Sequence, residues 1–312
     1  MLVASFVRLS PYAIQSRMAN LDTFVELIDR HAPVDGTHAT SLPGVKLIRA
    51  SSPTLPMPVI YEPTLCLVAQ GAKQAVLGAT AYRYDPAHYL VASVELPVMG
   101  SVVTASADKP YLCLQLDLDM PQLSDLAIRH PAAPGDTLAT PAGLTLNRTA
   151  PPLLDAAIRL LGLLDAPDDI EALAPLIVRE MLYRLLTGSG GGVIRQMAQT
   201  ESRLMRIAQA ILWIRTRFRE RCPIDAAAAV AGMSRSTFHA HFKTITTMSP
   251  LEFRTQLRMQ EARRLMVSDA MDAASAGYSV GYDSPSQFSR DYARLFGLPP
   301  GKDASRLRDA SR

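Results

Sequence analysis

The chain has 312 residues, of which 48% are hydrophobic and 20% charged, a composition typical of a soluble globular protein with room for two domains. No apolar run is long enough to span a bilayer. The net charge of +3 is unevenly distributed: residues 195–312 carry 19 Lys and Arg against 11 Asp and Glu (+8), and residues 1–194 carry 13 against 18 (−5). A basic half beside an acidic half indicates a domain that binds a polyanion, the alternative being a basic surface without a partner.

The first 17 residues, MLVASFVRLSPYAIQSR, contain an apolar patch but no convincing cleavage site, so we expect no signal peptide. Met18 is an alternative start, because MANLDTFVELIDRH begins a clean amphipathic helix. The three cysteines, Cys66, Cys113 and Cys222, are sparse and odd in number. They form neither a disulfide framework nor a CxxC site, which fits a reducing cytoplasm.

The remaining elements predict an α+β chain. After a helix at 19–32, short β-rich pieces such as VKLIRAS, TLCLVAQ and HYLVASV follow one another from about Val45 to Leu118, the spacing of an all-β sandwich or barrel. Apolar residues at helical intervals predict two amphipathic helices, at 152–164 and 169–187. GSGGG at 188–192 predicts a flexible break. The domains expected are therefore 1–190, a linker at 191–204, and an all-helical domain at 205–312.

The C-terminal part contains the same pattern twice. Ser234 of SRSTFHAHFK aligns with Ser284 of SPSQFSRDYARLFG, and aromatic residues follow each serine at intervals of four. Each copy comes after a small-residue helix and a glycine, Gly232 or Gly281, where the turn needs a left-handed residue. Helix, tight turn and serine-capped helix form a helix-turn-helix. A helix over 249–266, about 27 Å long, would hold the two units about one DNA turn apart.

These motifs are similar to those of a known family. MSRSTFHAHFK, MSPLEFRTQLRMQEARRLM and VGYDSPSQFSRDYARLFGLPP resemble the DNA-binding domain of AraC/XylS-type transcriptional regulators over residues 205–300. YEPTLCLVAQGAKQAVLG and YRYDPAHYLVASVELPV resemble the cupin-like N-terminal domain of one branch of that family. The resemblance implies a cupin-like β-barrel with flanking helices, followed by an all-α domain with two helix-turn-helix motifs. It implies a sequence-specific DNA-binding regulator that is not an enzyme and needs no cofactor.

The same resemblance assigns DNA-contacting positions. In the first unit they are Arg235, Ser236, His239, Ala240 and Lys243, the last near a phosphate; in the second unit they are Ser286, Gln287 and Arg290. Two positions depart from the family pattern. Ala240 stands where the family commonly has Arg and cannot hydrogen-bond to a base. Thr247 stands where the family usually has Gly, which puts the tightness of that turn in doubt.

The N-terminal domain is expected to bind a small-molecule effector. Polar side chains scattered among its strands are the candidate contacts: Tyr61, Cys66, Gln70, Lys73, His88 and Tyr89. Cys66 is read either as inert packing or as a thiol open to an electrophile such as an aldehyde. The helices over 152–187 either form a homodimer interface or only cover the barrel. The other partners expected are promoter DNA and RNA polymerase, in a cytoplasmic protein associated with the nucleoid, without a membrane.

Three chemical alternatives are weaker. GYSVG at 277–281 matches the nucleophile elbow of hydrolases, but no strand precedes it and no histidine follows His241. His239 and His241 lie two residues apart, so on a helix they cannot share one metal ion. A cupin-type metalloenzyme fused to a helical domain would need a His-x-His, whereas the β-rich region offers His88. We therefore predict no metal site.

Overall fold

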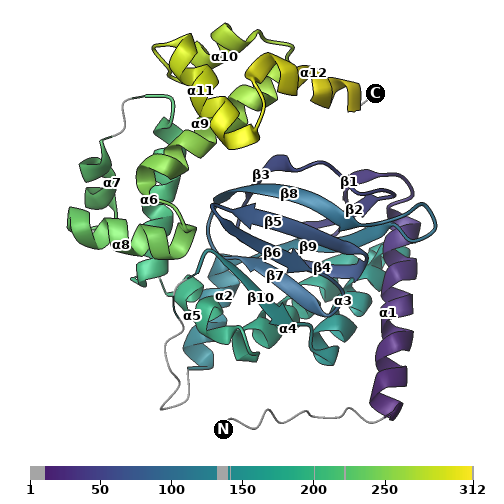
Figure 1. The fold of residues 1–312 in the computed structure, drawn as a ribbon. Coiled ribbons are helices and arrows are strands. Elements are labelled where there is room, and N and C mark those ends of the chain that lie inside the picture. The colour runs from purple at the N-terminus through teal and green to yellow at the C-terminus, as the bar shows by residue number, and fades with distance from the viewer. Residues whose placement is uncertain (1–10, 132–139, 141, 200, 221–222, 311–312) are drawn as a thin grey trace, which may run out of the picture.

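The structure, a computed structural model, describes residues 11–131, 140, 142–199, 201–220 and 223–310 (Figure 1). Cys222 and residues 1–10, on which two of the sequence expectations depend, lie outside the described residues. A two-sheet β unit with a layer of helices forms one part of the molecule, and a group of shorter helices forms the other. The class is α+β, as the sequence predicted.

The strands form two antiparallel sheets. The larger sheet has the order β1-β2-β9-β4-β7-β10, and its strands span Gly36–Ala39, Val45–Ala50, Tyr111–Asp117, Thr64–Gln70, His88–Ala92 and Leu144–Arg148. The smaller sheet has the order β3-β8-β5-β6, with strands at Met57–Tyr61, Leu96–Thr104, Ala72–Leu77 and Thr80–Tyr84. No pairing joins the two sheets among the described strands, so the unit is a sandwich, one of the two arrangements that the strand spacing allowed, and not a closed barrel. The alternation of short strands does not distinguish a sandwich from a barrel, because closure depends on pairing between distant strands.

Helices cover the larger sheet and one edge of the unit. They are α1 (Pro11–His31), α2 (Met120–Arg129), α3 (Pro151–Gly162), α4 (Ile170–Thr187) and α5 (Gly191–Ala198), with short 3₁₀ turns at Leu163–Asp165 and Pro167–Asp169. The two helices predicted between 152 and 187 are thus present as α3 and α4. Their buried residues recur at helical spacing, and α3 packs against both α1 and α4.

The flexible break expected at GSGGG is wrong. Gly190 is the N-cap of α5, whose Val193, Ile194 and Met197 are buried. This helix packs against α2 and α4. Glycine allowed the tight turn into α5, since a Cβ at Gly191 would clash with the Leu186 carbonyl oxygen. Most of the segment expected as a linker is therefore a packed helix.

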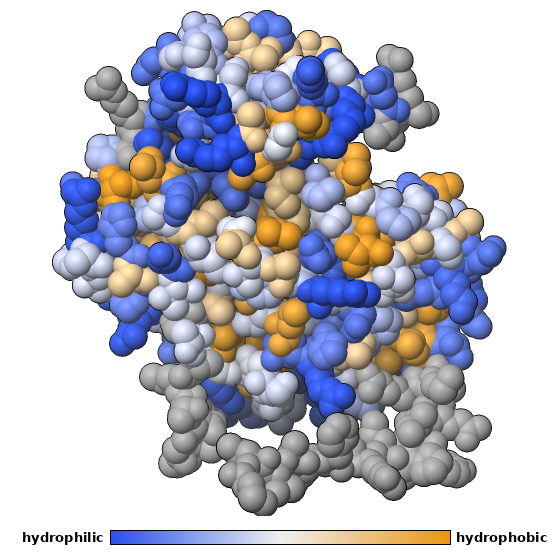
Figure 2. All heavy atoms as spheres, viewed as in Figure 1, coloured by the Kyte–Doolittle hydropathy of each residue, from blue (hydrophilic) through white to orange (hydrophobic). Residues whose placement is uncertain are grey.

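The C-terminal part is entirely helical. It contains α6 (Arg203–Arg217), α7 (Ile224–Val230), α8 (Arg235–Thr246), α9 (Pro250–Ser268), α10 (Ala273–Ser279), α11 (Pro285–Phe296) and α12 (Pro300–Ala310). Strongly hydrophilic residues gather on this upper part of the molecule in the space-filling view (Figure 2). No helix in the described part of the chain combines the length and the hydrophobicity that a membrane span requires.

Candidate nucleic-acid interface

The first helix-turn-helix unit is formed by α7 and α8. Ser234 caps α8, with its hydroxyl accepting a hydrogen bond from the Thr237 amide at 3.3 Å. Phe238 and Phe242, one turn apart, are fully buried, and Phe242 meets Phe253 of α9 edge to face. Gly232 in the turn has φ of +59°, the left-handed conformation that the sequence predicted. The local sequence thus turns one aromatic face of α8 inward.

The opposite face of α8 carries the predicted DNA-contacting residues. Arg235, Ser236, Ala240 and Lys243 are exposed, and His239 is half-buried. The Arg235 guanidinium lies 3.5 Å from the Asp225 carboxylate, and both side chains are about two-thirds exposed. Such a surface pair is weak, so Arg235 can exchange this partner for another acceptor.

The second unit, α10 and α11, repeats the arrangement. The Ser284 hydroxyl accepts from the Gln287 amide, and Pro285 occupies the first turn of α11. Phe288 and Tyr292 are buried, while Ser286, Gln287 and Arg290 are exposed. Gly281 has φ of +87°, and a Cβ there would clash with the Arg219 carbonyl oxygen. Glycine is therefore required at this turn for two independent reasons.

Helix α9 joins the two units and belongs to both cores. Its 19 residues span about 28 Å, and a capping box between Ser249 and Glu252 fixes its start. Phe253 and Leu257 pack in the first core, whereas Met259, Ala262 and Leu265 pack in the second. Figure 1 shows α8 near one end of α9 and the α10–α12 group at the other. One stiff helix therefore holds the two units apart.

Two arginines of α9, Arg258 and Arg263, hold the second unit against this helix. Arg258 donates to the carbonyls of Phe218 and Gly281, at 2.6 and 2.9 Å, and its guanidinium lies 5.7 Å from the centre of the Tyr282 ring. Burial raises the pKa of Tyr282 to about 12, so its hydroxyl stays protonated at neutral pH. These contacts of half-buried Arg258 are not evident from a sequence in which α9 has arginines on several faces.

The second of these arginines, Arg263, forms a buried ion pair. The Arg263 guanidinium donates to both carboxylate oxygens of Asp303 in α12, at 2.8 and 3.1 Å, and both side chains are almost completely buried. Tyr292 of α11 donates its hydroxyl to Asp303 at 2.9 Å. Asp303 therefore connects α9, α11 and α12, and the sequence reading did not identify it.

The helical part also contacts the β unit directly. The Gly143 amide donates to the Ile245 carbonyl at the end of α8, at 2.9 Å, and Thr247 donates its hydroxyl to the Leu77 carbonyl at 2.8 Å. Thr247 has φ of +62°, so threonine adopts the left-handed turn that the family usually makes with glycine. Arg215 of α6 forms an ion pair with Glu95 at 2.5 Å. The end of α8 is thus held by the N-terminal sheets.

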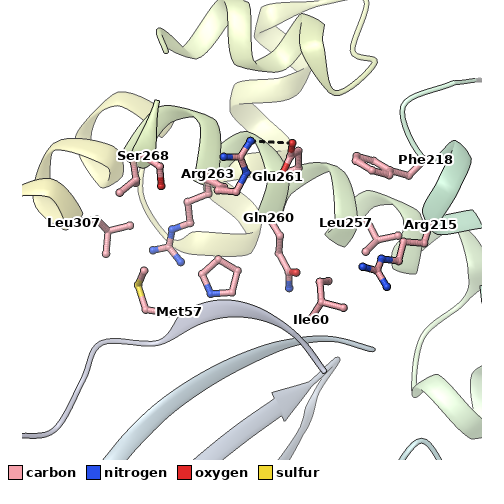
Figure 3. Close-up of a pocket in the computed structure, with 13 residues that line it drawn as sticks. Met57, Ile60, Arg215, Phe218, Leu257, Gln260, Glu261, Arg263, Ser268 and Leu307 are labelled. Carbon is pink, nitrogen blue, oxygen red and sulfur yellow. Dashed lines mark hydrogen bonds and ion pairs between the residues drawn. The ribbon is translucent and has the colours of Figure 1, made fainter. Parts of the chain in front are cut away.

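A cavity of about 340 Å³ lies at this contact, between β3 and helices α9 and α12 (Figure 3). Gln260 and Arg263 of α9 point across it toward Met57 and Ile60 of β3. Gln260 donates to the Val98 carbonyl at 3.4 Å, and Arg263 donates to the Pro56 carbonyl at 3.3 Å. Gln260 and Arg263 are thus already engaged in holding the two parts together.

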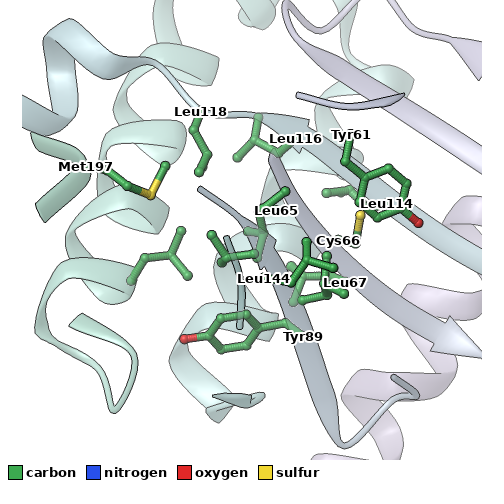
Figure 4. Packing of buried hydrophobic residues seen from close by; sticks show 14 of the residues in the cluster. Tyr61, Leu65, Cys66, Leu67, Tyr89, Leu114, Leu116, Leu118, Leu144 and Met197 are labelled. Carbon is green, nitrogen blue, oxygen red and sulfur yellow. The ribbon is translucent and has the colours of Figure 1, made fainter. Parts of the chain in front are cut away.

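The six predicted effector contacts do not converge on one point. Tyr61, Cys66 and Lys73 meet between the two sheets: the Lys73 ammonium lies 5.8 Å from the centre of the Tyr61 ring, and the Tyr61 and Tyr84 hydroxyls are 2.9 Å apart. Figure 4 shows the Cys66 sulfur beside Tyr61. Tyr84, Tyr111 and Cys113, which the sequence reading missed, complete this buried cluster. Tyr111 and Cys113 alternate along one strand and therefore share a face, which the sequence could have indicated. The sequence could not show which strands pair, and so could not show that this face meets Tyr61 and Cys66.

The other three lie elsewhere. Cys66 pairs with Leu90, so Tyr89 points to the opposite face of the sheet (Figure 4). Gln70 donates to the Pro110 carbonyl at 2.9 Å, and half-exposed His88 lies 3.1 Å from the Asp85 carboxylate. The six candidate residues therefore do not line one pocket, because neighbouring residues on a strand face opposite ways.

The environment of Cys66 favours the packing interpretation. A hydrogen bond with the Cys113 thiol and complete burial raise the pKa of the Cys66 thiol well above its ordinary value. A raised pKa disfavours the thiolate, which is the reactive form. Cys66 and Cys113 are both free thiols.

Neither the hydrolase-like motif GYSVG nor the candidate metal ligands form an enzymatic site within the described residues. Ser279 of GYSVG ends α10 and donates its hydroxyl to the Ser275 carbonyl at 2.7 Å, so it belongs to the helix-turn-helix turn. No cluster of three or more His, Cys, Asp or Glu side chains suited to a metal ion occurs in the described part of the chain.

Comparisons with known proteins agree with this architecture. Residues 41–193 match a family model described as the AraC-type transcriptional regulator N-terminus, and residues 227–306 match a helix-turn-helix domain. The RCS-specific HTH-type transcriptional activator RclR of Escherichia coli (strain K12) is 33% identical over 27% of this chain and 30% of its own length. The virulence regulon transcriptional activator VirF of Yersinia enterocolitica is 25% identical over 53% of this chain and 60% of its own. The matches thus cover less than two thirds of the length of these relatives.

Solved structures share the fold over nearly the whole chain. An apo variant of ToxT from Vibrio cholerae strain SCE256 superposes with a TM-score of 0.52, covering 85% of this chain and 98% of that one, at 9% identity. ToxT from Vibrio cholerae O395 bound to (E)-4-(8-methylnaphthalen-1-yl)but-3-enoic acid gives a TM-score of 0.50 at 11% identity, covering 84% and 98%. At this identity the likeness concerns the fold alone.

Proposed function

Because this chain belongs to the AraC family of transcriptional regulators, we propose that it binds promoter DNA sequence-specifically and thereby regulates transcription. One observation carries the proposal: two serine-capped helices, α8 and α11, present exposed polar faces near the two ends of one stiff helix, α9. Helices of this kind enter successive major grooves when they lie about one DNA turn, roughly 34 Å, apart.

Each reading helix has its own set of DNA contacts in this proposal. On α8, Arg235 and His239 read base edges, Ser236 and Ala240 lie against the groove, and Lys243 contacts a phosphate. On α11, Gln287 and Arg290 read bases beside Ser286. Arginine is suited to guanine and glutamine to adenine, because each offers a bidentate hydrogen-bond pattern. The net charge of +8 on residues 195–312 supplies the salt-dependent part of the affinity.

The N-terminal part is proposed to bind a small-molecule effector and to pass its effect to the helical part. The contacts of Thr247 with Leu77 and of Arg215 with Glu95 support such coupling, since a shift of the sheets would reach α8 and α6 directly. RNA polymerase at the promoter is the proposed target of the bound regulator. No catalytic role and no cofactor are proposed, and the site of action is the nucleoid in the cytoplasm.

A homodimer through residues 152–187 is a further part of the proposal. Leu173 and Leu176 of α4 are exposed, at 42% and 63%, and face outward on the helix layer. Sedimentation of the full chain checks it: Leu176→Glu should shift a dimer toward monomer. Equal sedimentation of both proteins as monomers would exclude the interface.

The proposed DNA contacts are tested on bound sites mapped across the genome. Fluorescence anisotropy then measures the affinity of the full chain for such a site and for random DNA. Arg290→Ala should weaken binding to the specific site by about 1–3 kcal/mol and relax base choice under α11. Arg129→Ala, which removes an exposed arginine from α2 in the N-terminal part, serves as the matched control and should leave affinity unchanged. Equal losses on specific and random DNA would contradict a base-reading role for Arg290.

A further inference from the structure

Arg258 lies at the point of α9 where the core of the first unit ends and the core of the second unit begins. Leu257 packs in the first core, whereas Met259 packs in the second. Two units that share one connecting helix move relative to each other unless a further contact joins them. The angle between the two units therefore depends on what surrounds α9 at this point.

A further contact joins the end of α6 to the turn of the second unit. Helix α6 packs against α7 and α8, so it belongs to the first unit. A Cβ on Gly281, in the turn between α10 and α11, would lie 2.0 Å from the carbonyl oxygen of Arg219, just after α6. The backbone of the first unit therefore touches the backbone of the second unit beside α9.

The side chain of Arg258 stabilises this contact. Its guanidinium donates to the Gly281 carbonyl at 2.9 Å and to three carbonyls after the last turn of α6: Phe218 at 2.6 Å, Arg219 at 3.2 Å and Glu220 at 3.1 Å. Carbonyls at the end of a helix lack intrahelical donors and carry partial negative charge, so a cation is favoured there. The planar guanidinium reaches the four acceptors from three nitrogen atoms, which the single nitrogen of a lysine cannot do.

The first unit has an arginine in the corresponding place, but its partners differ. Arg206 of α6 donates to the Ala231 carbonyl at 2.8 Å and to the Gly232 carbonyl, at the turn between α7 and α8. Both partners belong to the same unit as Arg206. Arg206 therefore stabilises a turn within one unit, whereas Arg258 joins a turn to the other unit.

We propose that Arg258 is a positioning residue, which sets the angle between the reading helices α8 and α11 by joining the end of α6 to the turn at Gly281. The inference rests on the proposed function, because it concerns the spacing of the two half-sites on DNA. One added base pair moves the second half-site by about 3.4 Å along the duplex and about 35° around it. Two helices held at a fixed angle accept one spacing, whereas two helices at a variable angle accept several.

The first test measures the distance between the two reading helices without DNA. Spin labels are attached at Thr244→Cys in α8 and Arg294→Cys in α11, both exposed positions, in a full chain that also carries Cys222→Ser. Electron paramagnetic resonance should give one narrow distance distribution when Arg258 is present. Arg258→Met should give a distribution about twice as wide, because more orientations are populated. Arg206→Met, the matched control, should leave the width unchanged.

The second test measures the preference for half-site spacing by fluorescence anisotropy. It uses a site mapped in the genome and two derivatives, in which one base pair is inserted or removed between the half-sites. The unaltered chain and Arg206→Met should lose at least about tenfold in affinity on either derivative, since the second helix then misses its bases. Arg258→Met should lose less than about threefold. The ratio of two affinities does not depend on the fraction of a preparation that is folded.

Distance distributions of equal width in the unaltered chain and in Arg258→Met would overturn the inference. So would an equal preference for spacing in these two proteins. If Arg258→Met does not fold, Arg258→Lys replaces it in both tests, because lysine keeps the charge and lacks the planar fork. If the unaltered chain prefers no mapped site over random DNA, the proposed function is wrong, and the distance distribution still decides whether Arg258 holds the two helices.

Discussion

The hydroxyl of Thr247 donates a hydrogen bond to the Leu77 carbonyl over 2.8 Å, joining residues 170 positions apart. Thr247 ends the first reading helix in a left-handed conformation, and Leu77 ends strand β5. This bond compensates for the strain of a β-branched residue at positive φ, which glycine would have avoided. A residue that departs from the family pattern therefore serves as a contact between the two parts of the molecule.

Replacement of Thr247 tests this contact. Thr247→Ser keeps the hydroxyl and should change the free energy of unfolding by less than about 0.5 kcal/mol. Thr247→Val leaves the Leu77 carbonyl without its donor and should cost about 1–3 kcal/mol. Urea unfolding of the full chain measures both. Equal stability of the two variants would show that the hydroxyl contributes nothing.

Alanine substitutions at two glycines distinguish the stability cost of a left-handed backbone from the stability cost of a steric clash. Gly297 and Gly281 both have positive φ, but a Cβ at Gly297 meets nothing within 4 Å, whereas one at Gly281 clashes with the Arg219 carbonyl oxygen. Gly297→Ala should cost about 1 kcal/mol, the penalty of a left-handed alanine. Gly281→Ala should cost at least about 2 kcal/mol more, since the backbone must also move. Thermal unfolding compares them, and similar melting temperatures would disprove the crowding.

The Arg263–Asp303 pair should behave as a coupled buried unit. Asp303→Ala leaves the Arg263 guanidinium buried without a counter-charge, at a cost of about 3–5 kcal/mol. Arg263→Met leaves Asp303 with Arg306, whose guanidinium lies 3.0 Å from its carboxylate, and should cost less. The double variant should cost clearly less than the two single changes together. A double-mutant cycle from chemical unfolding gives the coupling energy. Simple additivity would mean that the pair is not coupled.

The capping box of α9 predicts a pH dependence of stability. The Ser249 side chain and backbone amide hydrogen-bond with Glu252 and hold its pKa below the ordinary value of 4.5. A lowered pKa in the folded state means that the stabilisation is fully present above pH 4.5 and is lost as the pH falls through the folded value. The wild type should exceed Glu252→Gln in stability by under about 1 kcal/mol at pH 7, because this carboxylate is exposed. A difference that stays constant down to pH 2 would contradict this role.

The duplicated helix-turn-helix was readable from the sequence because its signals are local. A serine before each reading helix, aromatic residues every four positions, and a glycine in each turn lie within a few residues of the structure they determine. The left-handed turns at Gly232 and Gly281 and the inward faces of Phe238 and Phe288 follow from these neighbours alone. The base contacts themselves stay a prediction from the family pattern.

Only the tertiary structure determined the contacts between residues that lie far apart in the sequence. Pairing of β4 with β7 and β9 determined that Cys66 meets Tyr61 and Cys113 while Tyr89 faces away, and that the strands form two sheets. The same holds for α5 at the glycine-rich segment and for Thr247 against Leu77. Local sequence encodes helices, caps and turns through short-range sterics and hydrogen bonds. Which side chains come together from strands far apart depends on register and packing, which no single segment contains.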